Sequence, residues 1–116
     1  MRKDTVRKMA LALPEAEERE TWGTPTFRVR NKIFAMFSEG GREVWLKSTH
    51  DEQRALVAMD PDTYFVPPYV GPSGWVGVVM SAASDRDEIR ELLTEAWRLT
   101  APKRLVAAFD EDELGA

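Results

Sequence analysis

The stretch Thr26–Lys47, TFRVRNKIFAMFSEGGREVWLK, decides the fold that we expect for this chain. Turn-forming residues divide it near Arg30–Lys32 and at Gly40–Gly41, and apolar and polar residues alternate between these turns. A period of two is typical of strands, because successive side chains of a strand point to opposite faces of the sheet. The stretch therefore predicts three consecutive antiparallel strands.

The second turn sets a clear register. Gly40–Gly41 suits a two-residue hairpin loop that needs positive φ at both positions. This loop pairs Phe37 with Val44 and Met36 with Trp45. These pairs predict that Phe37 and Trp45 point to opposite faces of the sheet.

The first turn allows two registers. A two-residue loop sets Val29 opposite Lys32, and a three-residue loop sets Val29 opposite Ile33. We prefer the three-residue loop because it gathers the apolar side chains on one face, and a slip by one residue would scatter them. That face would carry Phe27, Val29, Ile33, Ala35, Phe37, Val44 and Leu46.

The second face of this sheet mixes large apolar groups with cations. It would carry Thr26, Arg28, Phe34, Met36, Ser38, Glu43, Trp45 and Lys47. One interpretation is that a second layer or a later loop covers it, and this is the one we favour. The other is a partner surface, since exposed apolar area rimmed by charge usually has a use.

The bulk composition fits one domain. The chain has 116 residues, of which 43% are hydrophobic and 31% charged, and a net charge of −4. Without cysteine it has no disulfides or thiolate chemistry, and no apolar run is long enough for a membrane span. We therefore expect a cytoplasmic monomer or weak dimer, and an acidic balance that argues mildly against nucleic acid.

The rest of the chain predicts helices that cover the sheet. We expect an α+β domain over residues 1–109, with a curved antiparallel sheet, helices packed on one face, and an acidic tail over 110–116 that frays. The expected helices cover Thr5–Leu13, a segment capped by Thr49 that runs to Met59, and a segment from Ser84 to about Thr100. Acidic Ala16–Trp22 is expected to be a loop or an edge strand, and Trp75–Met80 a further strand.

Catalytic and metal-binding patterns are weak. His50 is the only histidine, so the usual zinc and triad constellations cannot form, and no glycine-rich phosphate-binding motif occurs. The acidic run before Trp22 and the acidic tail lack the pattern of a fixed metal site. We therefore expect no metal, no cofactor and no enzymatic activity.

The cations of the hairpins have the most organised spacing. Arg28, Arg30 and Lys32 surround one turn, Arg42 lies beside the next, and Lys47 follows the last strand. Basic hairpins can grip phosphate backbones while a nearby aromatic such as Trp45 stacks or wedges. Basic residues at strand ends also protect sheet edges, and the residues alone favour that interpretation.

Nearly the whole chain, roughly residues 4–106, resembles the MmcQ/YjbR family of small bacterial proteins. The segments that carry the resemblance are Leu11–Pro14, Trp22–Val29, Lys32–Ala35, Val44–Lys47, Pro68–Gly71, Ser73–Val76, Ala96–Trp97 and Ala101–Leu105. The resemblance implies a compact α+β domain, similar in shape to frataxin-like and type III secretion-chaperone domains. It also implies non-enzymatic binding of duplex DNA through a double-wing arrangement of hairpins.

Two functional hypotheses follow. In the first, Arg28, Arg30, Lys32, Arg42 and Lys47 contact the phosphates of duplex DNA, and Trp45 stacks or wedges. In the second, the chain binds an unknown small molecule or protein through an aromatic groove. That groove would be lined by Trp22, Phe34, Met36, Trp45, Tyr69 and Trp75.

Overall fold

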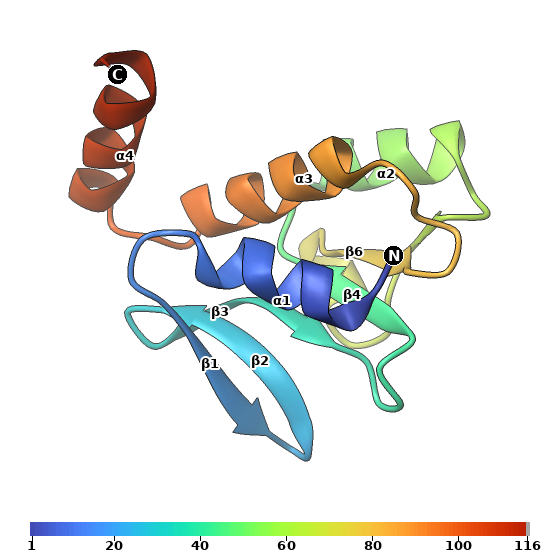
Figure 1. The fold of residues 1–116 in the computed structure, drawn as a ribbon. Coiled ribbons are helices and arrows are strands. Elements are labelled where there is room, and N and C mark those ends of the chain that lie inside the picture. Colours follow the sequence, from blue (N-terminus) through green and yellow to red (C-terminus); the bar gives the residue numbers. More distant parts are fainter. Residues whose placement is uncertain (116) are drawn as a thin grey trace.

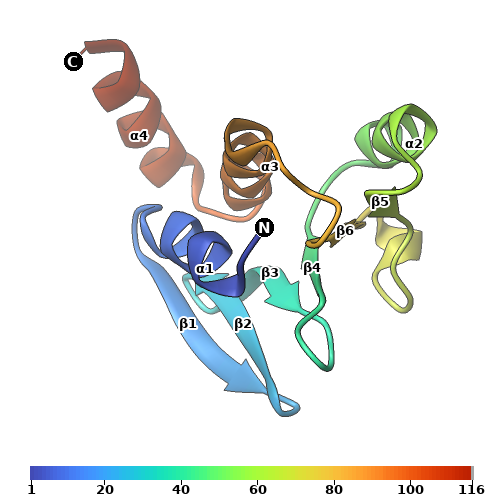
Figure 2. The same cartoon turned by 45° about the vertical axis from the view of Figure 1, so that its right-hand side comes forward.

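The computed structural model describes residues 1–115, which form an α+β domain. The strands of its antiparallel sheet are β1 (Ala16–Thr21), β2 (Thr24–Val29), β3 (Lys32–Phe37), β4 (Glu43–Leu46), β5 (Tyr64–Phe65) and β6 (Val76–Val79). The helices are α1 (Lys3–Leu11), α2 (His50–Met59), α3 (Arg86–Arg98) and α4 (Lys103–Gly115), with a 3₁₀ turn, η1, at Gly71–Ser73. Figures 1 and 2 show α1, α2 and α3 on one side of the sheet. The expected fold class is therefore confirmed.

The first four strands lie side by side in the sheet in the order in which they occur in the chain. Its spatial order is β1-β2-β3-β4-β6-β5, and every neighbouring pair is antiparallel. The acidic segment Ala16–Thr21 forms the edge strand β1, as one of the two alternatives predicted. The predicted meander is therefore the centre of the sheet.

The β3–β4 register is the predicted one. Phe37 pairs with Val44 and Met36 with Trp45. The last hydrogen-bonded pair before the turn is Ser38 and Glu43, in which the Ser38 amide donates to Glu43 O (2.9 Å). Residues 39–42 therefore form the loop, which is wider than the two-residue loop that we expected. Gly40 and Gly41 both adopt positive φ (86° and 72°), the conformation that glycine reaches most readily. Phe37 and Trp45 therefore point to opposite faces.

The β2–β3 register combines both alternatives, and our preferred three-residue loop is wrong. Phe27 pairs with Ala35, as expected, but Arg28 pairs with Ile33 and Val29 with Lys32 across a two-residue turn. A bulge between these pairs makes Phe34 an extra residue on β3.

The bulge places two side chains differently from our prediction. Phe34 is completely buried, although we expected it on the second face, and Ile33 is partly exposed, although we expected it in the core. A bulge re-aims the side chains on either side of it, so the apolar set stays gathered without the loop length that we chose.

The helices close one face of the sheet. Val6 and Ala10 of α1 and Leu93 of α3 are fully buried against it. The rings of Phe27 and Phe37 meet edge to face at 5.6 Å, a favourable arrangement for aromatic pairs. Buried Trp97 donates its indole N–H to Pro14 O (2.9 Å), so α3 is tied to the turn that follows α1.

Helix ends differ in detail from the expectations. Thr49 caps α2 as predicted, by accepting from the Glu52 amide (3.2 Å). Helix α3 is capped by Asp85, not by Ser84, because the Asp85 carboxylate reaches the Asp87 and Glu88 amides. In residues 1–115 no helix is both long and apolar enough to cross a bilayer.

Helix α4 includes most of the expected tail. We expected the chain to fray from Asp110, but α4 continues to Gly115. Its middle is held by an ion pair between Arg98 Nη2 and Asp110 Oδ1 (2.7 Å) and by contact between the Trp97 and Phe109 rings (5.1 Å). Ala116, the last residue of the expected tail, lies outside the described residues.

Candidate functional site

The face of the sheet that points away from α1, α2 and α3 is the candidate site, and we call it the open face. Cross-strand pairing defines one row of side chains over all six strands: Arg19, Thr26, Met36, Trp45, Gly77 and Phe65. Met36, Trp45 and Phe65 are partly exposed. No helix within residues 1–115 lies against this face (Figures 1 and 2), so helices cover the sheet on its other face only.

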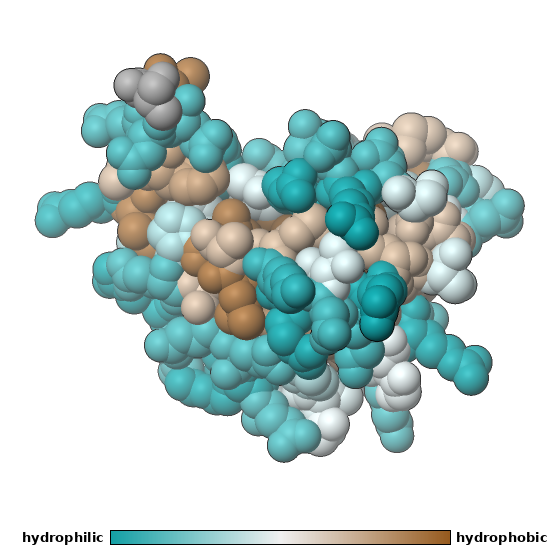
Figure 3. Space-filling view, viewed as in Figure 1, coloured by the Kyte–Doolittle hydropathy of each residue, from teal (hydrophilic) through white to brown (hydrophobic). Residues whose placement is uncertain are grey.

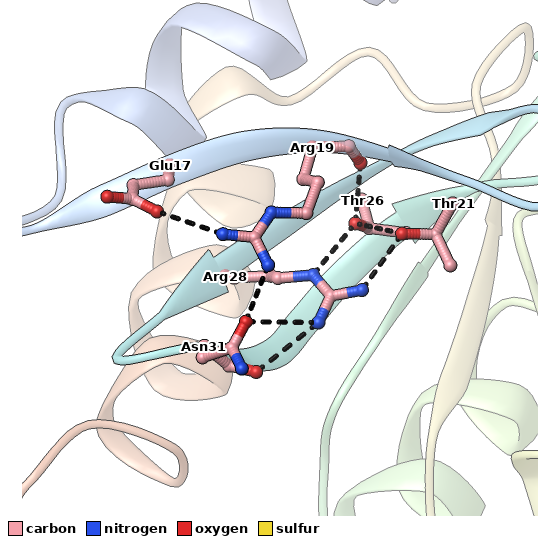
Figure 4. Close-up of polar contacts among 6 residues, drawn as sticks. All are labelled: Glu17, Arg19, Thr21, Thr26, Arg28 and Asn31. Carbon is pink, nitrogen blue, oxygen red and sulfur yellow. Dashed lines mark hydrogen bonds and ion pairs between the residues drawn. The ribbon is translucent and has the colours of Figure 1, made fainter.

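Arg28 lies on the open face, and its guanidinium is fixed by neutral acceptors (Figure 4). Nε donates to Thr26 Oγ1 (3.3 Å) and Nη2 to Thr21 Oγ1 (2.8 Å). Nη1 donates to the backbone oxygen of Asn31 (3.3 Å), with the amide oxygen of the same residue at 3.5 Å. The edge of the guanidinium is therefore almost fully used in hydrogen bonds.

This arrangement leaves the charge of Arg28 without a carboxylate partner. Among residues 1–115, no acidic oxygen lies within ion-pair distance of it. An arginine whose edge is occupied can still offer its flat face, which stacks on aromatic and nucleobase rings. Arg28 is therefore better placed to stack than to form the phosphate contact that we expected.

Arg19 supports the same network from β1. Its Nη1 donates to Asn31 Oδ1 (2.7 Å), and its Nη2 lies 3.8 Å from Glu17 Oε2. Thr26 is completely buried beneath these side chains and donates its hydroxyl to Arg19 O (2.6 Å). The network is thus built from β1, β2 and the turn after β2.

The aromatic part of the open face lies on the central and far strands. Trp45 donates its indole N–H to Glu43 Oε1 (3.2 Å), which fixes the ring on the surface. Phe65 covers Gly77, where an added Cβ would stand 2.3 Å from Phe65 Cζ. Met36 lies between Thr26 and Trp45 in the row, so apolar surface continues from the arginines to the tryptophan.

Arg30 does not join this site. Its guanidinium makes two hydrogen bonds to the Glu15 carboxylate, from Nε (2.5 Å) and Nη2 (3.0 Å). The hydrogen bond with Arg30 holds the pKa of Glu15 below its usual range and raises the pKa of Arg30 in turn. Arg30 also lines a hollow of about 380 Å³ beside α4 with Pro102 and Leu105.

The predicted basic set is therefore not a single cluster. Lys32 is exposed at the start of β3, Arg42 is exposed in the turn between β3 and β4, and Lys47 is half-buried directly after β4. Of the six predicted residues, Arg28 and Trp45 share the open face. Sequence reasoning missed Thr21 and Arg19 because their role depends on the pairing of β1 with β2, which the residues did not predict. It missed Asn31 because the turn between β2 and β3 was not predicted correctly.

The predicted aromatic groove is wrong as a single site. Phe34 is fully buried and Trp75 is 8% exposed, so both belong to the interior. Trp22 is 83% exposed in the β1–β2 turn, and Tyr69 is 90% exposed in the loop between β5 and β6. Met36 and Trp45 remain as the part of that set on the open face.

The helix side carries a groove between α1, α3 and α4. It has a volume of about 800 Å³, with Met9, Leu13 and Phe109 among its apolar lining and Lys8 and Glu113 among its charges. Figure 3 shows apolar surface gathered on this side between α1 and α4, surrounded by polar atoms. Charges of both signs line the groove, so its chemistry selects no ligand class.

The described part of the chain contains no cluster of side chains arranged for metal binding, and its histidine has a structural contact. No group of three His, Cys, Asp or Glu side chains in residues 1–115 is placed to hold a metal ion. His50 Nε2 lies 2.8 Å from Pro72 O, and the Gln53 amide donates to Gly71 O (2.8 Å) and Trp75 O (2.6 Å). These contacts tie α2 to the loop that includes η1, which is a structural role.

Comparisons with known proteins identify the family. The crystal structure of Deinococcus radiodurans protein DR2400, with a DUF419 domain, has a similar fold, with a TM-score of 0.74 and 19% sequence identity over 83% of this chain and 75% of that one. The uncharacterized proteins Rv2570 of Mycobacterium tuberculosis and Mb2600 of Mycobacterium bovis are each 44% identical over 55 residues. That match spans 47% of this chain and less than half (42%) of each relative.

The family model named YjbR matches residues 11–99. This region begins at the last residue of α1 and contains the whole sheet, α2 and α3. It therefore contains the open face and most of the helices that cover the other face. The chain belongs to the YjbR family.

Proposed function

We propose that this protein is a non-enzymatic module that binds single-stranded nucleic acid on the open face of its sheet. The observation that carries the proposal is Arg28, a cation laid on the sheet with its edge bound to Thr21, Thr26 and Asn31 and with no carboxylate partner. Such a group supplies both a planar stacking surface and a positive charge, which are the two features that a nucleotide recognises.

Trp45 supplies the second stacking surface. It lies two strands from β2, in the row of Thr26, and Arg28 is two residues further along β2. With strands about 4.8 Å apart and about 3.3 Å per residue, Trp45 and Arg28 are separated by roughly 12 Å across the sheet. Aromatic rings that alternate with cations on an open sheet are a common platform for single strands.

A single strand fits the charges better than a duplex does. A duplex would need a strip of free cations to follow its backbone, but Arg30 is bound to Glu15, and Lys32 and Arg42 lie at opposite ends of the β3 hairpin arm. The net charge of −4 also provides no long-range attraction. We therefore expect modest affinity, with stacking as the main source of binding free energy and a shallow dependence on salt.

The test is a fluorescence-anisotropy titration of a labelled oligothymidine of about ten nucleotides, compared with a duplex of the same length, at about 50 and 200 mM salt. The wild type should bind the single strand more tightly than the duplex. Arg28→Met and Trp45→Ala should each weaken binding by about tenfold, since a stacked base contributes about 1–3 kcal/mol.

Arg54→Ala is the matched control. Arg54 is an exposed arginine of α2 that pairs with Asp51, so its removal changes the net charge as Arg28→Met does without touching the open face. An equal loss of affinity in the two variants would show a charge effect only. No binding by the wild type at the lower salt, or tighter binding of the duplex, would contradict the proposal.

A further inference from the structure

The β1–β2 turn holds a tryptophan in an unfavourable position. Trp22 has φ +53° and Gly23 φ +77°, and the flanking residues Thr21 and Thr24 pair with each other. Two-residue hairpin turns with positive φ at both central positions prefer Asn, Asp or Gly there, because a bulky side chain is strained at positive φ. The Trp22 side chain is nevertheless 83% exposed, so burial does not compensate for the strain.

The turn is closed by a side-chain hydrogen bond, and it is connected to Arg28. The Thr24 hydroxyl donates to Thr21 O (3.1 Å), and the Thr21 hydroxyl accepts from Arg28 Nη2 (2.8 Å). The residue that holds the guanidinium is therefore the one directly before Trp22. Because side chains alternate along β1, Glu20 lies on the opposite side of the hairpin from Arg19 and Thr21.

We propose that Trp22 is a base-stacking residue that extends the open-face site to the tip of the β1–β2 hairpin. This inference rests on the proposed function and adds to it: the Arg28 guanidinium reaches Thr21, so a single strand with a base stacked on Arg28 would pass Trp22 at the tip of the hairpin. An exposed, strained and apolar residue beside a fixed cation matches the wedge and platform residues of nucleic-acid sites.

The test uses Trp22→Asn in the anisotropy titration with oligothymidine, together with a thermal melt. Asparagine tolerates positive φ far better than tryptophan does, so the variant should melt at the same or a higher temperature than the wild type. It should also bind the single strand about fivefold more weakly. A residue with a purely structural role would give a lower melting temperature and unchanged binding.

Tyr69→Asn is the matched control. Tyr69 is also strained (φ +66°) and 90% exposed, but it lies in the loop between β5 and β6, next to the opposite edge of the sheet from β1. It should gain stability in the same way with no loss of affinity.

The outcomes separate the two proposals. If Arg28→Met weakens binding and Trp22→Asn does not, this inference is overturned and the proposed function stands. If Trp22→Asn and Tyr69→Asn weaken binding equally, the effect is not specific to the hairpin, and the inference is also overturned. If the wild type binds no oligothymidine, the proposed function fails and the role of Trp22 fails with it.

Discussion

The two faces of the sheet are built from the same strands but are stabilised in different ways. On the covered face, Phe27, Val44 and their neighbours are fully buried under α1 and α3. On the open face, the side chains are ordered by hydrogen bonds around Arg28 and by the half-exposed Met36 and Trp45. The comparison teaches that burial holds the covered face, whereas the open face keeps a fixed cation and apolar surface within reach of solvent.

The largest expected effect is on the covered face. Phe37→Ala removes a ring that is 1% exposed and packs against Phe27, so it should lower the free energy of unfolding by about 3–5 kcal/mol. Met36→Ala, one residue away on the open face, should lower it by about 1 kcal/mol or less, because its side chain is already partly hydrated. Urea denaturation measures both. Similar losses would show that the two faces do not differ as described.

Gly77→Ala tests how tightly the far end of the open face is packed. The new methyl group would overlap the Phe65 ring, and the ring must move, so we expect a loss of about 1–3 kcal/mol. The double variant Gly77→Ala with Phe65→Ala should recover part of that loss, since the overlapping ring is gone. If Gly77→Ala alone is neutral in urea denaturation, Phe65 is not held over Gly77.

The sequence predicted the covered face better than the open one. Alternation and the Gly40–Gly41 turn were enough for the β3–β4 register, because a single slip would expose the whole apolar set. The bulge at Phe34 was not predictable, since it exchanges Phe34 with Ile33, and both side chains are apolar. Hydropathy alone cannot distinguish such a pair.

The open-face site was predictable only in part. Arg28 and Trp45 were found because cations and aromatics alternate in the quoted stretch. Thr21, a partner of Arg28, lies on β1, and only the pairing of β1 with β2 brings the two side chains together. Asn31 is three residues from Arg28, but its contact depends on the shape of the turn between β2 and β3. Arg30 was chosen as a contact residue, and its pairing with Glu15, 15 residues away in the chain, removed it from the site.

A smaller effect should appear at high pH on the covered face. Burial, with a hydrogen bond to Glu88 (2.5 Å), raises the pKa of Tyr64 above its ordinary value of 10.0. The folded state therefore favours the protonated phenol. This contribution to stability is complete below about pH 10 and is lost as the pH rises toward the folded pKa.

Comparison with Tyr64→Phe isolates this contribution. The free energy of unfolding of the wild type should fall more steeply above pH 10 than that of the variant, in urea titrations between about pH 8 and 11. The rest of the chain titrates alike in the two proteins, so the difference between them reports on Tyr64. Parallel curves would mean that Tyr64 has the same pKa in the folded and unfolded states.

The smallest expected effect concerns Glu15. Glu15→Gln leaves Arg30 without its ion pair and makes the net charge less negative by one, but Arg30 lies beside α4 and outside the open-face site. Affinity for the single strand should therefore change by less than about twofold at 200 mM salt. A large gain in duplex affinity, measured by anisotropy, would instead show that Arg30 and its turn between β2 and β3 can contact nucleic acid.

The most direct test of the central claim is a map of backbone amide shifts by nuclear magnetic resonance as oligothymidine is added. Our account predicts that the largest changes occur at Thr26, Arg28, Met36 and Trp45, whose side chains share the open face, while α1 and α3 change little. Changes that cluster on the helices, or beside α4 around Arg30, would contradict it.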